Sequence, residues 1–235
     1  MIISVYRNTR DIDVYFPEYD WTKESVRYEN FKNGSISCPY ERRTCGIGYL
    51  GEGKYKVREN GKETEYHIAW KTMMIRCYSD NKHKKYTTYI KCTVCDEWHC
   101  FQNFAKWYEE NYYKIENERI DLDKDILNKG NKIYSPNSCI FVPRRINSLF
   151  VKNDIDRGEY PIGVSYRKRG GVYIAQCRND KNREFLGRFN NSIDAFNSYK
   201  EYKEKIIKEV ADKYKDKIPN KLYEALYKYE VEITD

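Results

Sequence analysis

Two stretches in the first half of the chain place apolar residues at helical spacing. The segments HIAWKTMMIRCY (67–78) and WHCFQNFAKWYEEN (98–111) repeat large apolar side chains every three or four positions. This spacing puts them on one face of a helix, where they can be buried against a neighbouring element. The predicted core residues are Trp70, Met73, Met74 and Cys77 in the first segment and Phe101, Phe104, Ala105 and Tyr108 in the second.

The middle of the chain changes to a strand pattern. Residues 121–127 have β-type spacing, and Asn128–Asn131 form a predicted turn in which Gly130 is free to adopt positive φ. A second strand is predicted for 138–142, and Pro143 suits the first turn of a helix that runs to Phe150. The pattern therefore predicts a β-hairpin followed by a helix, a ββα unit.

Three further strands are predicted near the C-terminus, at 163–167, 172–178 and 183–189. Arg-Gly-Gly and Asn-Asp-Lys-Asn turns join them, and a helical pattern over 192–214 follows. These elements predict a three-stranded antiparallel sheet packed on a helix, with one sheet face left free. The residues predicted for the inner face of the helix are Ala195, Phe196, Tyr199, Tyr202 and Ile206.

The N-terminal residues have no clear periodicity, and several glycines follow them, so an extended arm or a small sheet is expected there. The predicted fold class is α+β, in three segments. Residues 1–65 are the arm or small sheet, 66–156 the helices and the ββα module, and 157–235 the sheet and helix with a helical tail.

Charge and aromatic content favour a polyanionic partner. The chain has 43 Lys and Arg against 36 Asp and Glu, a net charge of +7, together with 24 Tyr and 9 Phe. Seven basic and two acidic residues lie between Tyr160 and Phe189, so the predicted sheet carries +5. A sheet of this width can enter the DNA major groove. The predicted DNA-binding residues are Arg167, Lys168, Arg169, Tyr173, Arg178, Arg183 and Arg188, with Arg144 and Arg145 at the ββα helix.

The eight cysteines are irregularly spaced, which is unlike a secreted disulfide framework, and we expect reduced thiols. Cys92 and Cys95 could form half of a tetrahedral zinc site, but no second close pair completes it. Structural zinc is therefore not expected. The apolar run at Met1–Val5 is too short for a signal peptide or a membrane span, so a cytosolic protein is expected.

The ββα unit has side chains suited to phosphodiester chemistry. Asp123 can supply a carboxylate oxygen and Asn147 an amide oxygen, and both suit Mg²⁺ that keeps several of its waters. Such an ion stabilises charge on a scissile phosphate. A general base is needed beside the metal ligand, and the residue there is Lys124.

The segment from Arg119 to Phe150 resembles the HNH endonucleases, whose fold is a ββα-metal module. The segments 70–81 and 95–108 resemble those that precede the module in phage-encoded HNH proteins. The resemblance implies a metal ligand at Asp123, a structural asparagine at Asn137 and a metal-facing helix residue at Asn147. Lys124 occupies the position of the family's general-base histidine.

The segments GVSYRKRGGVYIAQC (163–177) and FLGRFNNSIDAFNSYKEYK (185–203) resemble the plant ethylene-response-factor (Apetala-two) DNA-binding domain. Phage HNH proteins often carry such a domain at the C-terminus. The resemblance implies binding to double-stranded DNA in a bacterial host cell, by a phage-encoded protein that has no membrane partner. Monomer and dimer remain open.

Two functions are compatible with these residues. The first is a mobile or homing endonuclease that uses Mg²⁺ or Mn²⁺. In that case Lys124 needs a strongly lowered pKa, which the neighbouring Asp123 and Asp125 oppose, or Asp125 is itself the base or a second metal ligand. The second is a DNA-binding protein that keeps the scaffold without cutting, in a regulatory or counter-defence role.

Overall fold

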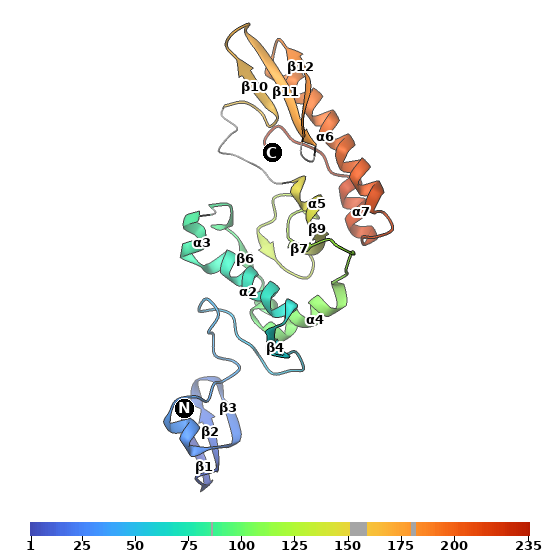
Figure 1. Cartoon of the computed structure of the whole chain (residues 1–235). Coiled ribbons are helices and arrows are strands. Elements are labelled where there is room, and N and C mark those ends of the chain that lie inside the picture. Colours follow the sequence, from blue (N-terminus) through green and yellow to red (C-terminus); the bar gives the residue numbers. More distant parts are fainter. Residues whose placement is uncertain (86, 151–158, 180–181) are drawn as a thin grey trace. The chain divides into compact units, whose positions relative to one another are not determined.

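The computed structural model describes residues 1–85, 87–150, 159–179 and 182–235, and it is a mixed α+β protein (Figure 1). The chain forms two compact units. The first contains Met1–Tyr112 and Lys132–Ser138, and the second contains Tyr113–Asn131 and Cys139–Asp235. The predicted segment boundary between residues 156 and 157 lies outside the described residues. In the described part, no helix is both long and apolar enough to cross a membrane.

The first unit begins with a small antiparallel sheet. Strands β1 (Ile2–Asn8), β2 (Asp11–Phe16) and β3 (Trp21–Val26) pair in chain order. The central strand is the buried one, because Ile12 and Val14 are fully buried beneath the short helix α1 (Tyr28–Lys32) and the residues that follow it. The N-terminal residues therefore form a sheet.

The helical layer of the first unit is built on α2 (Glu65–Tyr78) and α4 (Phe101–Asn111), which pack together. The predicted core residues of both helices are buried, as expected. Trp70 also donates its indole N–H to the carbonyl of Trp98 at 2.8 Å, which fixes the two aromatic residues. The remaining elements of this unit are η1 (Pro17–Tyr19), β4 (Arg58–Glu59), β5 (Lys62–Glu63), α3 (Asp80–Lys85), η2 (Thr87–Tyr89), β6 (Thr93–Val94), η3 (Asp96–His99) and β8 (Ile133–Tyr134).

The second unit begins with the predicted ββα arrangement. Strands β7 (Ile120–Asp123) and β9 (Ile140–Pro143) pair antiparallel, and α5 (Arg144–Ser148) follows directly. The first strand was predicted to continue to Leu127, and this is wrong, because it ends at Asp123. The Asp123 carboxylate accepts the backbone N–H groups of Asp125 and Ile126, so these donors cannot take part in a strand ladder.

The C-terminal sheet and helix match the predicted elements closely. Strands β10 (Val164–Arg167), β11 (Val172–Asn179) and β12 (Asn182–Phe189) form an antiparallel sheet in chain order. Helix α6 (Ser192–Tyr214) packs against it, and α7 (Asn220–Tyr227) follows. Gly163 has φ +77°, and the Tyr199 ring lies where a Cβ would stand, so the helix approaches the sheet closely at this glycine.

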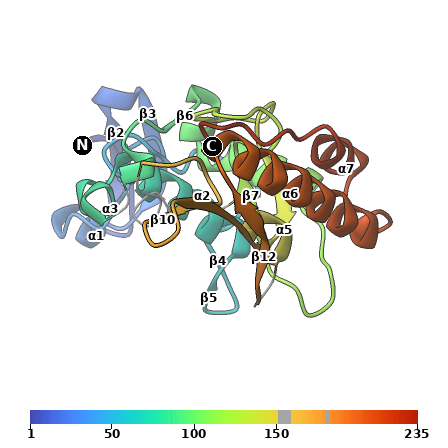
Figure 2. The same ribbon diagram turned by 90° about the horizontal axis from the view of Figure 1, so that it is seen from above.

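One hydrophobic core joins the ββα module to the C-terminal sheet and helices. Ile140, Val142 and Ile146 belong to the same buried cluster as Ala175 and Ile207. Figure 2 shows the chain from above, and helices α5 and α6 of this unit are in contact. The ββα module therefore depends on α6 for its burial and is not a separate body within this unit.

Candidate nucleic-acid interface and ββα site

Asp123 ends strand β7, and one oxygen of its carboxylate is hydrogen-bonded to the backbone that follows. Its Oδ1 accepts hydrogen bonds from the N–H groups of Asp125 at 2.9 Å and Ile126 at 2.7 Å. Burial raises the pKa of Asp123 to about 6, and the neighbouring Asp125 charge contributes to the rise, whereas the two N–H donors oppose it. Among the described residues, no donor to Asp123 Oδ2 is found, so this oxygen remains available to a ligand.

Lys124 is buried, with 6% of its surface exposed, and its ammonium group has defined partners. Its Nζ lies 3.2 Å from Asp125 Oδ2 and donates to the carbonyl of Asn131 at 3.1 Å. Asn131 returns a hydrogen bond from its side-chain amide to the Lys124 carbonyl at 2.7 Å. An ammonium group has three donors and no lone pair, and in these contacts Lys124 acts only as a donor.

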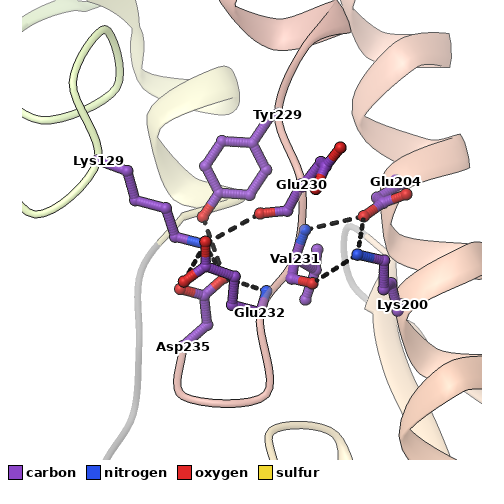
Figure 3. A network of polar contacts seen from close by, with 8 residues as sticks. All are labelled: Lys129, Lys200, Glu204, Tyr229, Glu230, Val231, Glu232 and Asp235. Atoms are coloured by element: carbon purple, nitrogen blue, oxygen red, sulfur yellow. Dashed lines mark hydrogen bonds and ion pairs between the residues drawn. The ribbon is translucent and has the colours of Figure 1, made fainter.

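The loop after Lys124 is also fastened to the C-terminal end of the chain (Figure 3). Lys129 Nζ lies 2.8 Å from Asp235 Oδ2, donates to the carbonyl of Glu230 at 3.0 Å, and stands over the Tyr229 ring. Asp235 is 5% exposed, so this ion pair is partly shielded from water. The residues that follow α7 therefore hold the loop that carries Lys124 and Asp125.

The two asparagines of the predicted site lie in different units. Asn147 is half-buried in α5, in the second unit with Asp123. Asn137 is exposed in a turn of the Lys132–Ser138 segment, which belongs to the first unit. Within the described chain, the asparagine that fastens the Lys124 loop is Asn131, which sequence reasoning missed. A usable signal was its position at the end of the Asn-Lys-Gly-Asn turn, seven residues after Lys124.

The three histidines all belong to the first unit. His67 lies 2.6 Å from Glu63, and burial lowers the pKa of its ring. His83 contacts the carbonyl of Arg76, and His99 contacts the carbonyl of Val94. The second unit contains no histidine, so the acid–base groups beside Asp123 are Lys124 and Asp125.

This region contains oxygen donors of the kind that hard cations prefer. Asp123 has one carboxylate oxygen without a partner in the described structure, and Asn147 carries an amide oxygen in the same unit. Mg²⁺ is commonly bound through one or two protein oxygens with the rest of its shell supplied by water and phosphate. Within the described residues, no group of three His, Cys, Asp or Glu side chains is placed to hold a metal ion. An ion at Asp123 must therefore keep most of its shell as water or substrate oxygen.

Strand register places four arginines on the sheet face opposite α6. Residues paired across antiparallel strands point to the same face, and side chains alternate along each strand. Ala175 and Cys177 are buried with α6, so the alternate residues of β11 form the outer face. In the pairing, Arg178 is opposite Arg183, and Arg188 is opposite Ile174. Arg167 completes the set opposite Val172, and all four arginines, here called the arginine face, are exposed.

The other predicted DNA-binding residues are placed differently. Lys168 and Arg169 are exposed in the β10–β11 turn, and Arg144 and Arg145 are exposed at the start of α5. Tyr173 belongs to the opposite sheet face from the arginines, because it shares the side of β11 that carries Ala175. Its ring packs against those of two other tyrosines, with centroids 5.5 Å from Tyr160 and 4.9 Å from Tyr166. The structure does not bring Tyr173 together with the arginine face.

The cysteines are free thiols, and most are buried. Cys92 donates weakly to the carbonyl of Thr88 at 3.6 Å, and burial raises the pKa of Cys95. A raised pKa keeps the thiol protonated at neutral pH, which makes it a poor nucleophile.

No protein-family model matches this chain, and neither a curated protein nor a solved structure does. Its function is therefore inferred from the geometry of its own residues.

Proposed function

We propose that this protein binds double-stranded DNA through the outer face of the β10–β12 sheet and that its ββα module is an HNH-like site for metal-dependent phosphodiester hydrolysis. The observation that carries the proposal is the arginine face, four exposed arginines on one side of a three-stranded sheet. Arg178 and Arg183 pair across β11 and β12, so their side chains lie on the same part of this face and concentrate positive charge there.

The arginine face is suited to duplex DNA by its chemistry. Arginine forks donate pairs of hydrogen bonds to guanine edges or to phosphate oxygens. Lys168 and Arg169 extend the positive charge into the turn beside the sheet. An exposed Phe185 lies on the same face, opposite Gln176, and can contact the thymine methyl or a sugar.

The ββα module contributes the residues for hydrolysis. Asp123 presents a carboxylate oxygen, Asn147 lies on the helix of the module, and the Asp125 side chain is 44% exposed. A bound Mg²⁺ or Mn²⁺ supplies charge stabilisation at the scissile phosphate. The proposed acceptor of a proton from the attacking water is Asp125, because the Lys124 ammonium group is a donor to Asp125 and to the Asn131 carbonyl. This assigns Lys124 a positioning role.

A second candidate function is DNA binding without cleavage. It is favoured by the Lys124 contacts, since the position that carries a histidine base in HNH enzymes here carries a buried cation tied to Asp125 and Asn131. Such a protein keeps the ββα module as part of the hydrophobic core that supports α6, and its role is regulation or counter-defence.

A single assay separates the two functions. Supercoiled plasmid is incubated with the protein in Mg²⁺, Mn²⁺ or EDTA, and nicked and linear products are resolved on a gel. The endonuclease predicts product only with metal, and Asp123→Ala and Asn147→Ala should remove it while duplex binding persists. Absence of product from the natural chain, together with metal-independent duplex binding, identifies the non-cleaving protein. In that case Lys124→His tests whether the site regains activity.

A further inference from the structure

The N-terminal sheet carries a second basic surface, far along the chain from the arginine face. A hollow of about 560 Å³ lies between the β1–β2 turn and α1, lined by Thr9, Arg10, Arg27, Tyr28, Glu29 and Lys32. Three of these residues are cationic and one is acidic, so the lining has a net charge of +2. This hollow belongs to the first unit, whereas the arginine face belongs to the second.

Two carboxylates of the same sheet are already neutralised. Arg7 bonds to Asp11 at 2.7 Å and also pairs with Asp13, so those two carboxylates are occupied by one guanidinium group. In contrast, no hydrogen bond or ion pair to the side chains of Arg10 or Arg27 occurs in the described structure. The sheet therefore uses one arginine for its own stability and leaves others open to solvent.

The walls of the hollow are held in place by the backbone. The N–H of Tyr28 donates to the carbonyl of Thr9 at 3.0 Å, which fastens the start of α1 to the β1–β2 turn. The turn itself is fixed by the Asn8 side chain, which accepts from the N–H of Arg10 at 2.8 Å. The Tyr28 ring packs edge-on against Tyr6. A ligand entering the hollow thus meets cations and an aromatic ring whose main-chain positions are already fixed.

We propose that this hollow binds a backbone phosphate of nucleic acid and gives the protein a second DNA contact, independent of the arginine face. Arg10 and Arg27 supply charge-assisted hydrogen bonds to phosphate oxygens, Lys32 adds a point charge, and Tyr28 packs against the attached sugar. This inference rests on the proposed function, because the polyanion is DNA. It adds to that function a second DNA contact, which lies in the first unit.

The test compares three double variants with the natural protein. Arg10→Gln/Arg27→Gln alters the hollow. Arg58→Gln/Lys62→Gln removes the same charge from the exposed β4–β5 hairpin of the same unit, and Arg178→Gln/Arg183→Gln alters the sheet. Binding of a labelled duplex is measured by fluorescence anisotropy without metal, from about 50 to about 200 mM salt. Circular dichroism confirms that each variant is folded.

The hollow variant should bind about fivefold to tenfold more weakly, and the slope of log affinity against log salt should fall by about 1 for each phosphate that the variant no longer neutralises. The hairpin variant should match the natural protein. If the hollow and hairpin variants behave alike, the inference is overturned. If only the hollow variant binds more weakly, the proposed DNA contact at the sheet is wrong and the proposed contact at the hollow is supported. If the natural protein binds no duplex, both are overturned.

Nuclear magnetic resonance separates DNA from free phosphate as the ligand. Backbone amide shifts of Arg10 and Tyr28 are followed while duplex DNA or inorganic phosphate is added at equal phosphate concentration. Shifts with DNA at concentrations where inorganic phosphate has no effect support the proposal. Equal responses to both would identify a site for free phosphate and overturn the assignment to nucleic acid.

Discussion

Two groups of basic side chains in the second unit have opposite surroundings. In the loop between β7 and β9, Lys124 and Lys129 are bonded to carboxylates and carbonyls of the same unit. On the outer face of the β10–β12 sheet, the arginines are exposed, and Arg178 and Arg183 face each other across two strands. The first group stabilises the fold, and the second carries the exposed positive charge to which we assign the proposed DNA contact.

This difference also shows what the candidate site can do. A cation bonded within its own loop fixes that loop and is not free to act on a substrate. A cation on an exposed face can reach a phosphate. Basic residues should therefore be assigned to function by their surroundings, and their number in the sequence is a weaker guide.

The largest expected effect is on DNA binding. Arg178→Gln/Arg183→Gln removes two charge-assisted contacts and should weaken duplex affinity by about 3 kcal/mol, on the order of a hundredfold. The free energy of unfolding should change by less than about 0.5 kcal/mol, because both side chains are exposed. Anisotropy and urea denaturation measure the two quantities. Reduced stability with unchanged affinity would show that these arginines stabilise the fold, as Lys124 and Lys129 do, and do not bind DNA.

Lys124→Met tests whether the lysines of the β7–β9 loop stabilise the fold. It keeps the apolar stem and removes the ammonium group, which leaves the Asn131 carbonyl without that donor. The free energy of unfolding should fall by about 2 kcal/mol, with little change in duplex affinity. Lys168→Met in the exposed β10–β11 turn is the matched control, and its stability should change by less than about 0.5 kcal/mol. Equal stability of the two variants would contradict the buried role of Lys124.

Asp123 gives a pH dependence of the metal-free protein. Its folded-state pKa is raised to about 6, so the folded chain binds more protons than the unfolded chain between about pH 4 and pH 6. Its contribution therefore lowers stability as pH rises through this window. Asp123→Asn keeps the hydrogen-bonding oxygen and should be more stable at pH 7 by about 1.5 kcal/mol, after discounting for partial exposure.

This difference should disappear below about pH 4, where the natural carboxyl group is protonated in both states. Urea denaturation at several pH values in EDTA measures it. The contrary result is a stability difference, Asn variant minus natural chain, that is smaller at pH 7 than at pH 4. It would mean that the pKa of Asp123 is lowered in the folded state.

The smallest effect is expected at the C-terminal contact of the loop. Lys129→Ala removes the partly shielded pair with Asp235 and should cost about 1 kcal/mol. Hydrogen exchange should quicken at the amides of Asp125 and Ile126, which lie in the loop that Lys129 holds. Glu232→Gln is the control, since its carboxylate is 60% exposed and 3.5 Å from Lys129. Equal exchange rates in both variants would show that the loop is fixed without Lys129.

The sequence determined the elements whose signals are local. Alternation and turn residues located β10, β11 and β12 to within about one or two residues, and helical periodicity located α6 and the buried faces of α2 and α4. These patterns succeed because burial of one face repeats at the period of the element itself. The excess of basic residues in the sheet could also be counted from the sequence.

The partners of each charged side chain depend on the three-dimensional fold. Asp123 ends β7 because its carboxylate bonds to the following backbone, and Asn131 rather than a more distant residue returns to Lys124. Tyr173 lies away from the arginine face because strand register assigns it to the other side of β11. Such contacts join residues across turns and strands, and their energy depends on distance and burial, which residue order alone does not specify.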